Sequence, residues 1–112
     1  MSAPGPAPFD VTVRDDGERV HIAVRGELDL ATADELESAL LPLVRDGRHA
    51  LLDLGGLDFM DSTGVRVLVT AHLAAEEHGG RFSLLRTHEG SPVGRVLEIS
   101  GLDGVLELVD EP

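Results

Sequence analysis

The sequence predicts a single α/β domain, in which a mixed β-sheet begins with an N-terminal hairpin and then alternates with helices. Two alternating strand patterns flank turn residues at positions 15–18. A short apolar run at residues 49–56 lies between two segments with helical spacing, and strands separated by helices favour parallel crossovers. The chain of 112 residues is long enough for one core. The predicted order of elements is β-β-α-β-α-β-α-β.

Composition disfavours several classes of function. The net charge is −12 and all nine basic residues are arginine, so the surface repels nucleic-acid phosphates and anionic lipid. The chain has no cysteine, which excludes disulfides, thiolate metal sites and a cysteine nucleophile, and which fits a reducing cytoplasm. We therefore expect a cytoplasmic protein whose partners are other proteins, with neither nucleic acid nor membrane among them.

The first eight residues alternate proline with small residues and offer nothing to bury. We expect a disordered tail at residues 1–8 and a folded domain at residues 9–110. The tail has neither the basic nor the apolar region of a signal peptide. No apolar run approaches the roughly 20 residues that span a bilayer, so we expect a soluble protein.

The N-terminal hairpin and the first helix have distinct patterns. Apolar residues alternate with polar ones on both hairpin strands: Phe9, Val11 and Val13, then Val20, Ile22 and Val24. Thr32 and Glu35 have the spacing of a capping box at the start of the helix. The core side of this helix is predicted from a stripe at helical spacing: Ala33, Leu36, Leu40, Leu43 and Val44. We expect Pro42 to kink the helix or loosen its last turn, and Gly47 to end it.

The middle of the chain predicts a buried strand and a second helix. Residues 49–56 are too few for a buried helix and indicate a central strand, with Gly55 and Gly56 as a tight turn behind it. The second helix ends at Gly79 and Gly80. Its core side is predicted from spacing: Val65, Leu68, Val69, His72 and Leu73.

Two further strands and a third helix complete the domain. The strands are expected at residues 81–86 and 105–109. Ser91 and Pro92 suit the N-cap and first position of the helix between them, and Gly101 suits its end. The core side of this helix is predicted to carry Val93, Val96 and Leu97.

No catalytic or cofactor-binding pattern occurs. The five histidines lack the short spacing of a zinc site, and His72 and His78 do not share one helix face. The chain has no glycine-rich phosphate loop, and Ser62 does not lie in a G-x-S-x-G elbow. The many carboxylates fit a solvated acidic face. We therefore predict no metal, no cofactor and no enzymatic activity.

The segment FMDSTG, residues 59–64, leads directly into the second helix. Asp61, Ser62 and Thr63 are three potential capping residues in a row, which is more than one helix needs, so we expect at least one free hydroxyl. Gly64 inside the first turn costs about 1 kcal/mol relative to alanine. Because glycine removes a side chain beside the hydroxyl, we interpret Gly64 as leaving room for another molecule to approach.

Three segments resemble the STAS domain in its bacterial form, the anti-sigma factor antagonist or anti-anti-sigma factor. They are GELDLATADEL at residues 26–36, LDLGGLDFMDSTGVRVLV at residues 52–69 and ISGLDGVLEL at residues 99–108. The resemblance extends in order and spacing over about residues 9–110. The D-S-T-G motif behind an apolar strand is the specific part, whereas GELD alone is weak.

The resemblance implies a function by partner switching. An unphosphorylated member of the family binds an anti-sigma factor and so frees a sigma factor for transcription. The anti-sigma factor is often a serine kinase that phosphorylates the antagonist with ATP, which breaks the complex until a PP2C-type phosphatase restores it. By position, Ser62 would be the phosphoacceptor. Asp29, Asp61, Thr63 and Gly64 would flank it in the partner-binding surface.

Two alternatives remain open at this point. Thr63 is the rival acceptor, because it lies next to Ser62 in the motif. Some STAS domains are not phosphorylated, and the alternative function is then a scaffold or ligand-binding module in a signalling complex. The chain departs from the family's pattern at Gly55, where a polar residue is common, and at Pro42, which is unusual in a helix.

Overall fold

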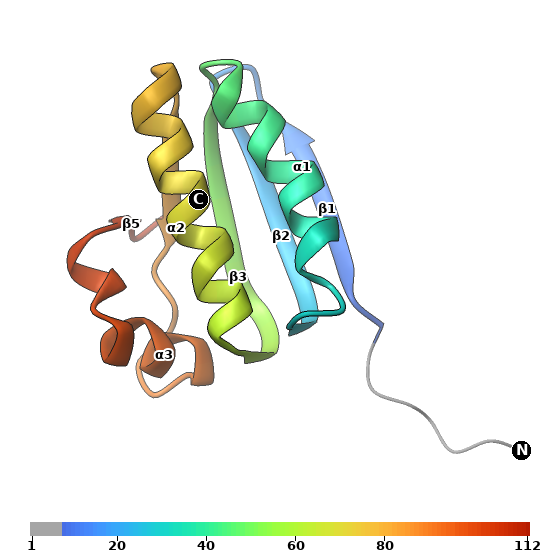
Figure 1. Ribbon diagram of the computed structural model, residues 1–112, viewed down its shortest axis with the longest axis vertical. Helices are drawn as coiled ribbons and strands as arrows, with labels where there is room; N and C mark the ends of the chain where they lie inside the picture. The colour runs from blue at the N-terminus through green and yellow to red at the C-terminus, as the bar shows by residue number, and fades with distance from the viewer. Residues whose placement is uncertain (1–7) are drawn as a thin grey trace, which may run out of the picture.

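A computed structural model describes residues 8–112, and Figure 1 shows how the elements are arranged. The expected disordered tail lies outside the described residues except for Pro8. The elements are β1 (Asp10–Asp15), β2 (Arg19–Leu28), α1 (Ala33–Arg45), β3 (His49–Met60), α2 (Ser62–His78), β4 (Arg81–Leu85), α3 (Pro92–Ser100), a 3₁₀ turn (Leu102–Gly104) and β5 (Glu107–Val109). The predicted α/β class and the predicted order of strands and helices are confirmed.

The strands form one five-stranded mixed sheet in the order β1-β2-β3-β4-β5. β1 is antiparallel to β2, with Val13 opposite Ile22, and every other neighbouring pair is parallel. Gly17 completes the hairpin turn at φ 94°, a left-handed conformation that glycine adopts without steric cost. Because the strand order increases steadily across the sheet, right-handed crossovers place the connecting helices on one face.

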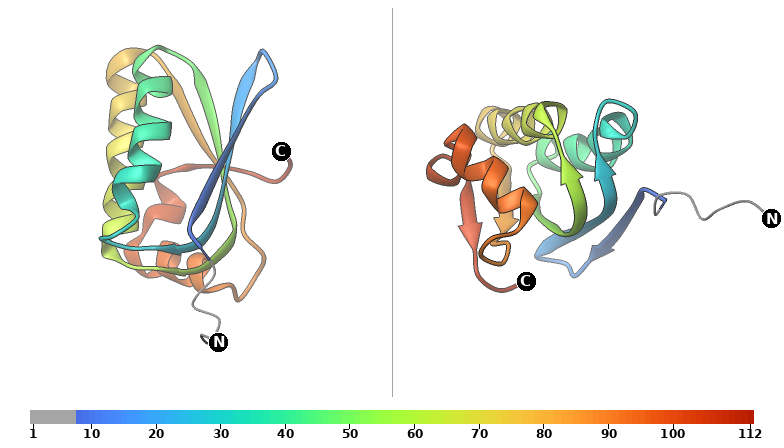
Figure 2. Two further views of the ribbon diagram at one scale, coloured as in Figure 1. Left: turned by 90° about the vertical axis from the view of Figure 1, so that its right-hand side faces the viewer. Right: turned by 90° about the horizontal axis from the view of Figure 1, so that it is seen from below.

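The domain has two layers. Figure 2 shows α1 and α2 side by side on one face of the sheet and α3 towards one end. The largest fully buried side chains include Ile22, Leu28, Leu36, Leu40, Leu52, Leu68 and Leu84, which form the core between the sheet and the helices. Within residues 8–112, no helix covers the other face of the sheet, and no helix is both long and apolar enough to cross a bilayer.

The central strand β3 is longer than the sequence indicated. It continues to Met60, so the tight turn predicted at Gly55 and Gly56 is wrong. A Cβ atom on Gly56 would lie 2.7 Å from Arg25 Cγ, which means that glycine lets β2 approach closely. The pairing of β2 with β3 shifts register beside this point. The irregular strand thereby extends to the acidic segment that precedes α2.

The core face of α2 also differs from the prediction. Leu73 is 57% exposed, whereas Val67 is fully buried. The buried side carries mainly small residues: Gly64, Val67, Leu68, Ala71, Ala74 and Ala75. Apolar residues occur around much of this helix, so hydrophobic spacing alone could not choose between faces. Close packing on the sheet selects the face with the small side chains.

The ends of the other helices are mostly as predicted. Ser91 caps α3, since its hydroxyl oxygen accepts a hydrogen bond from the N–H of Gly94 at 3.0 Å. Gly101 ends α3 in the left-handed conformation at φ 77°. Pro42 does not loosen the last turn of α1, because the N–H of Asp46 still donates to the carbonyl of Pro42 at 3.0 Å.

Candidate functional site

The carboxyl ends of β2 and β3 bring two distant sequence segments together. Leu28 pairs with Met60 at the end of the two strands, and the N–H of Asp61 donates to the carbonyl of Leu28 at 3.2 Å. Asp29 follows Leu28 directly, so the GELD and DSTG segments lie side by side. Parallel strands end at the same edge of a sheet, which makes this edge a usual place for a binding site.

Asp61 is the N-cap of α2. Its backbone is extended, and its Oδ1 atom accepts a hydrogen bond from the N–H of Thr63 at 2.8 Å. The carboxylate thus satisfies one of the free N–H groups at the start of the helix. Ser62 becomes the first helical residue rather than the cap, as the redundancy of capping residues suggested.

The two hydroxyls behind Asp61 differ in accessibility. Ser62 is exposed, whereas Thr63 is half-buried. Neither hydroxyl forms a hydrogen bond with another residue among 8–112. The hydroxyl of Ser62 is therefore the accessible one at the head of α2.

Gly64 has a different role from the one that the sequence suggested. The residue is buried, and a Cβ atom there would lie 2.9 Å from Leu28 Cδ2 and would also collide with Met60 Cγ. Glycine therefore lets the first turn of α2 pack against the ends of β2 and β3. The interpretation of Gly64 as a gap for an approaching molecule is wrong, because the space beside it is filled by the protein's own core.

Asp29 lies in a loop that its own neighbours hold in place. Its Oδ1 atom accepts a hydrogen bond from the N–H of Ala31 at 3.0 Å, and its N–H donates to Thr32 Oγ1 at 3.0 Å. The Thr32 hydroxyl donates to the carbonyl of Glu27 at 2.8 Å. Thr32 is the N-cap residue of α1, but its side chain bonds to this loop and makes no capping hydrogen bond, so the predicted capping box with Glu35 is wrong.

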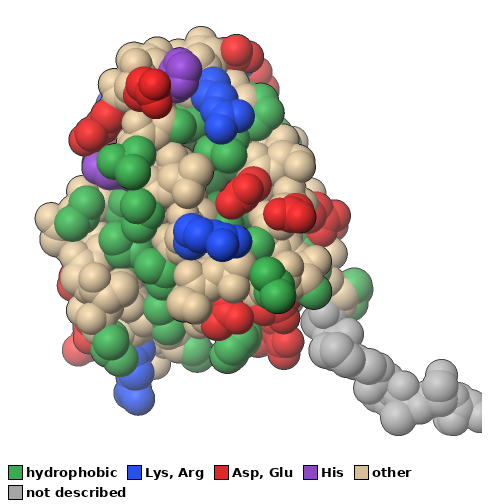
Figure 3. Space-filling view, viewed as in Figure 1, with side chains coloured by type: hydrophobic (Ala, Val, Ile, Leu, Met, Phe, Trp, Pro, Cys, Tyr) green, Lys and Arg blue, Asp and Glu red, His purple; other side chains and the backbone are tan. Residues whose placement is uncertain are grey.

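Two exposed apolar side chains flank this edge, and the sequence did not single them out. Leu30 is 76% exposed in the loop after β2, and Phe59 is 46% exposed near the end of β3. Asp58 beside Phe59 is also exposed. Figure 3 shows acidic and hydrophobic side chains close together at the lower end of the molecule, below α1 and α2. Exposed apolar side chains rimmed by polar residues mark many interaction sites, which makes this edge the candidate site.

A second polar cluster lies on β3, β4 and β5. His49 Nε2 lies 2.7 Å from Ser83 Oγ, and the Ser83 hydroxyl donates to Glu107 Oε1. Burial and the nearby Arg81 lower the pKa of His49, while hydrogen bonds from Arg81 and Ser83 lower the pKa of Glu107 against the opposing effect of burial. Ser83 is fully buried and donates its proton to a carboxylate. The cluster therefore ties β5 to β4 and offers no nucleophile.

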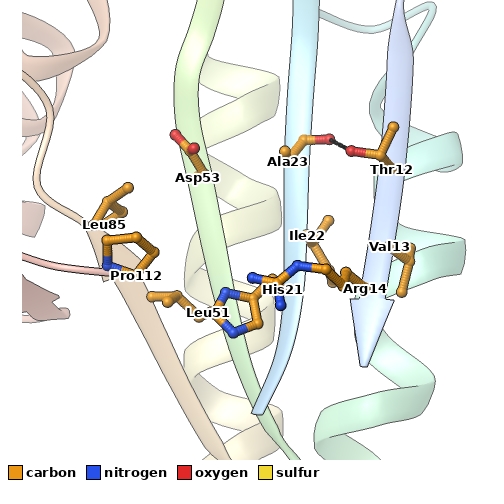
Figure 4. A pocket seen from close by; sticks show the side chains of 10 residues that line it. All are labelled: Thr12, Val13, Arg14, His21, Ile22, Ala23, Leu51, Asp53, Leu85 and Pro112. Atoms are coloured by element: carbon orange, nitrogen blue, oxygen red, sulfur yellow. Dashed lines mark hydrogen bonds between the residues drawn. The ribbon is translucent and has the colours of Figure 1, made fainter. Parts of the chain in front are cut away.

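A shallow hollow of about 370 Å³ lies on the helix-free face of the sheet. Figure 4 shows its apolar floor at Leu51 and Leu85, with Arg14 and Asp53 on opposite sides. Its polar groups have opposite charges and do not converge on one point, unlike those of a built ligand site. In the part of the chain that the structure describes, no three His, Asp or Glu side chains are placed to hold a metal ion.

Comparisons with known proteins agree on one family. Residues 11–110 match the family model described as "Mlab, STAS domain". The anti-sigma-B factor antagonist of Staphylococcus epidermidis is 32% identical over 88 residues, which cover 78% of this chain and 80% of that protein. The crystal structure of an anti-sigma factor antagonist from Mycobacterium paratuberculosis is similar with a TM-score of 0.80 and 26% identity, over 99% of this chain and 92% of the other. The Bacillus cell fate determinant SpoIIAA in its phosphorylated form is similar with a TM-score of 0.67 and 26% identity, over 91% of this chain and 93% of the other.

Proposed function

Because the chain belongs to the STAS domain family, we propose that it is an anti-sigma factor antagonist switched by phosphorylation at Ser62. Without phosphate, it binds an anti-sigma factor in the cytoplasm and so releases a sigma factor. The anti-sigma factor is a serine kinase that transfers phosphate from ATP to Ser62 and thereby ends the complex. A PP2C-type phosphatase removes the phosphate. The protein itself acts by binding and not as an enzyme.

The observation that carries this proposal is that Asp61 and Ser62 have different roles at the start of α2. Asp61 caps α2, which leaves the hydroxyl of Ser62 exposed at the head of the helix. A kinase must bring a base and the γ-phosphate to the acceptor oxygen, so an accessible hydroxyl is the first requirement. Thr63 is the weaker acceptor because its side chain is half-buried. A similar solved protein, SpoIIAA, exists in a phosphorylated form, which supports a phosphorylated state for this fold.

The proposed partner-binding surface consists of Asp29, Asp61, Ser62 and Thr63, with Leu30 and Phe59 as its exposed apolar members. Gly64 supports this surface from below by letting α2 pack closely on the sheet. The surface combines apolar side chains with carboxylates, so it suits a partner with apolar pockets and a basic rim.

Phosphate at Ser62 would act on this interface and not on the fold. A phosphoryl group adds about −1.5 to −2 charges. The head of α2 favours that charge by about 0.3–1 kcal/mol. One carboxylate at ~6 Å opposes it by about 1–3 kcal/mol if the effective dielectric constant is ~40. These opposing effects are comparable, so we expect no refolding, whereas a loss of only about 1.4 kcal/mol in binding weakens the complex tenfold.

Phosphate mapping tests the proposal directly. The protein is incubated with its purified anti-sigma factor and ATP, and phosphate is located by mass spectrometry. We expect phosphate on Ser62 in the natural chain and in Ser38→Ala, a control at an exposed serine of α1. Ser62→Ala should take up no phosphate, and Thr63→Ala should remain a substrate. Phosphate on Thr63 alone would move the switch to that residue.

The alternative function is a scaffold or ligand-binding module that is not phosphorylated. It predicts that the partner transfers no phosphate to residues 62 and 63. It also predicts equal affinity of the partner for Ser62→Ala and Ser62→Asp. These two results together would favour the scaffold function over the phosphorylation switch. The phosphate map carries more weight than the affinities, because aspartate is an imperfect mimic of phosphoserine.

A further inference from the structure

β1 is an edge strand whose outer side is open. It lies at one end of the strand order and pairs with β2 alone among the described strands. Figure 2 shows no helix beyond it. Five of its six residues are exposed, among them the apolar Val13 at 54%. β1 contains no proline, a residue that often protects an edge strand from further pairing.

The hairpin hydrogen bonds show which backbone groups of β1 face outwards. The N–H of Asp16 donates to the carbonyl of Arg19, so the backbone N–H of Asp16 faces the β2 side of the hairpin. Hydrogen-bonded and non-hydrogen-bonded pairs alternate along an antiparallel ladder. Residues 10, 12 and 14 therefore direct their N–H and C=O groups to β2. Val11 and Val13 direct theirs away from the sheet, where a further strand can accept from their N–H groups and donate to their C=O groups.

The sequence of β1, DVTVRD, is complementary to itself in the antiparallel direction. With Thr12 opposite Thr12 of a second copy, Asp10 lies opposite Arg14 twice, and Val11 lies opposite Val13 twice. The two valines are then the hydrogen-bonded pairs, as their outward backbone groups require. Asp10 and Arg14 are both exposed, and neither forms an ion pair with another residue among 8–112.

We propose that two copies of this chain associate through β1, antiparallel and centred on Thr12. The pairing joins two five-stranded sheets into one continuous sheet with a two-fold axis at Thr12. It buries the exposed Val13, satisfies the outward backbone groups and neutralises two charge pairs. Six residues per copy make a small interface, so the association is reversible and depends on concentration.

Neighbouring registers that keep the same backbone parity are less favourable. Centring on Thr12 is the register in which oppositely charged residues face each other and valine faces valine. A shift of the centre to Val13 places Val11 opposite Asp15 and Arg14 opposite Thr12. A shift to Val11 places Asp10 opposite Thr12 and leaves Arg14 without its carboxylate. Cross-strand charge pairs therefore select the register as well as the partner.

The dimer is independent of the proposed switch. The two chains run antiparallel, so the carboxyl ends of β3 in the two copies point in opposite directions, and the two Ser62 sites lie at opposite ends of the joined sheet. Neither site is covered by the pairing. Association can therefore be measured on the unphosphorylated protein without any partner, and its failure would leave the proposed function standing.

Charge exchange across the two-fold axis tests the proposal. Sedimentation velocity is measured over a concentration series for the natural chain, Asp10→Arg, Arg14→Asp and the double variant. Each single change turns two attractive contacts into repulsive ones, so we expect about tenfold weaker association for each. The double variant restores both pairs and should associate within about threefold of the natural chain. Arg95→Asp on α3, an exposed arginine away from β1, is the matched control and should change nothing.

Folding of each variant is checked by circular dichroism and urea unfolding, which should match those of the natural chain because all of these positions are exposed. Val13→Pro is a second probe, since it removes an outward N–H without removing a bond to β2. It should abolish the dimer. A monomer at every concentration up to about 1 mM overturns the proposal, as does a dimer that the single charge changes leave intact.

Discussion

The first turns of α2 and α3 follow one plan but use their serines in opposite ways. α2 begins with the segment DSTG at residues 61–64, and α3 begins with SPVG at residues 91–94. Asp61 caps α2 and leaves Ser62 exposed, whereas Ser91 caps α3 and is only 5% exposed. The hydroxyl oxygen of a capping serine already accepts a hydrogen bond from a backbone N–H. The position of a serine relative to the cap therefore decides whether its hydroxyl is available.

The two turns also share a glycine at the third helical position, and the two glycines avoid different neighbours. A Cβ atom on Gly64 would enter the apolar core at Leu28 and Met60, whereas one on Gly94 would lie 2.9 Å from the capping Ser91 Oγ. In α2 the glycine lets the helix pack closely on the sheet, and in α3 it leaves room for the side chain of the capping Ser91. The same residue type at the same helical position thus serves packing in one turn and hydrogen bonding in the other.

The largest effect is expected from Gly64→Ala. Overpacking against Leu28 and Met60 should cost about 1–3 kcal/mol, partly offset by about 1 kcal/mol of helix propensity. Urea unfolding measures the net loss. The loss should shrink in a Met60→Ala background, because the clash is then relieved. A gain in stability for Gly64→Ala alone would show that the first turn of α2 is not tightly seated.

The next largest effect is the loss of a cap. Ser91→Ala and Asp61→Ala should each lower the free energy of unfolding by about 1 kcal/mol, since each leaves an N–H of the first turn without its partner. Asp61→Asn keeps an accepting oxygen and should cost less than about half as much. Thermal and urea unfolding provide the measurement. Equal stability of Asp61→Ala and the natural chain would contradict the assignment of Asp61 as the cap.

Phosphate on Ser62 should change stability less than the loss of a cap does. The charge is favoured by the head of α2 and opposed by the neighbouring carboxylates, so we expect a net change below about 1 kcal/mol. Phosphoserine can be incorporated at position 62 during synthesis, and unfolding and circular dichroism can then be compared with the unmodified chain. A melted α2 in the phosphorylated protein would place the switch in the fold rather than in the interface.

The smallest effect is expected from Ser62→Ala. The hydroxyl is exposed and caps nothing, so stability should change by less than about 0.5 kcal/mol, while phosphate uptake should be lost entirely. The contrast with Ser91→Ala separates a free serine from a capping one. If Ser62→Ala destabilises the protein as much as Ser91→Ala does, the hydroxyl of Ser62 has a structural partner and the comparison between the two turns fails.

Much of the fold and part of the site could be predicted from local patterns. Alternation identified the hairpin, and cap and stop residues such as Ser91 and Gly101 marked α3 correctly. The acidic cap of α2 with a free hydroxyl behind it was also predictable, because three capping residues exceed what one helix uses. These features depend on interactions within a few residues of one another, which a sequence displays directly.

Predictions failed where distant segments compete for the same space. The small-residue face of α2, the continuation of β3 through Gly55 and Gly56, and the core role of Gly64 all depend on how closely β2 lies. Thr32 is a residue type typical of a helix cap and lies at the start of α1. Its hydroxyl donates to the carbonyl of Glu27 instead of capping the helix. The exposed pair Leu30 and Phe59 is recognisable as a surface only when β2 and β3 end at the same edge.

The sequence by itself determined the α/β class, the order of the elements, the acidic surface and the motif around Ser62. These follow from composition, period and short-range hydrogen bonding, which depend little on the rest of the chain. Tertiary structure decided which face of α2 is buried, which residues surround Ser62 and which strand edge stays open. Those outcomes depend on strand register and on packing at native density, where the free space beside a residue is set by segments far away in the sequence.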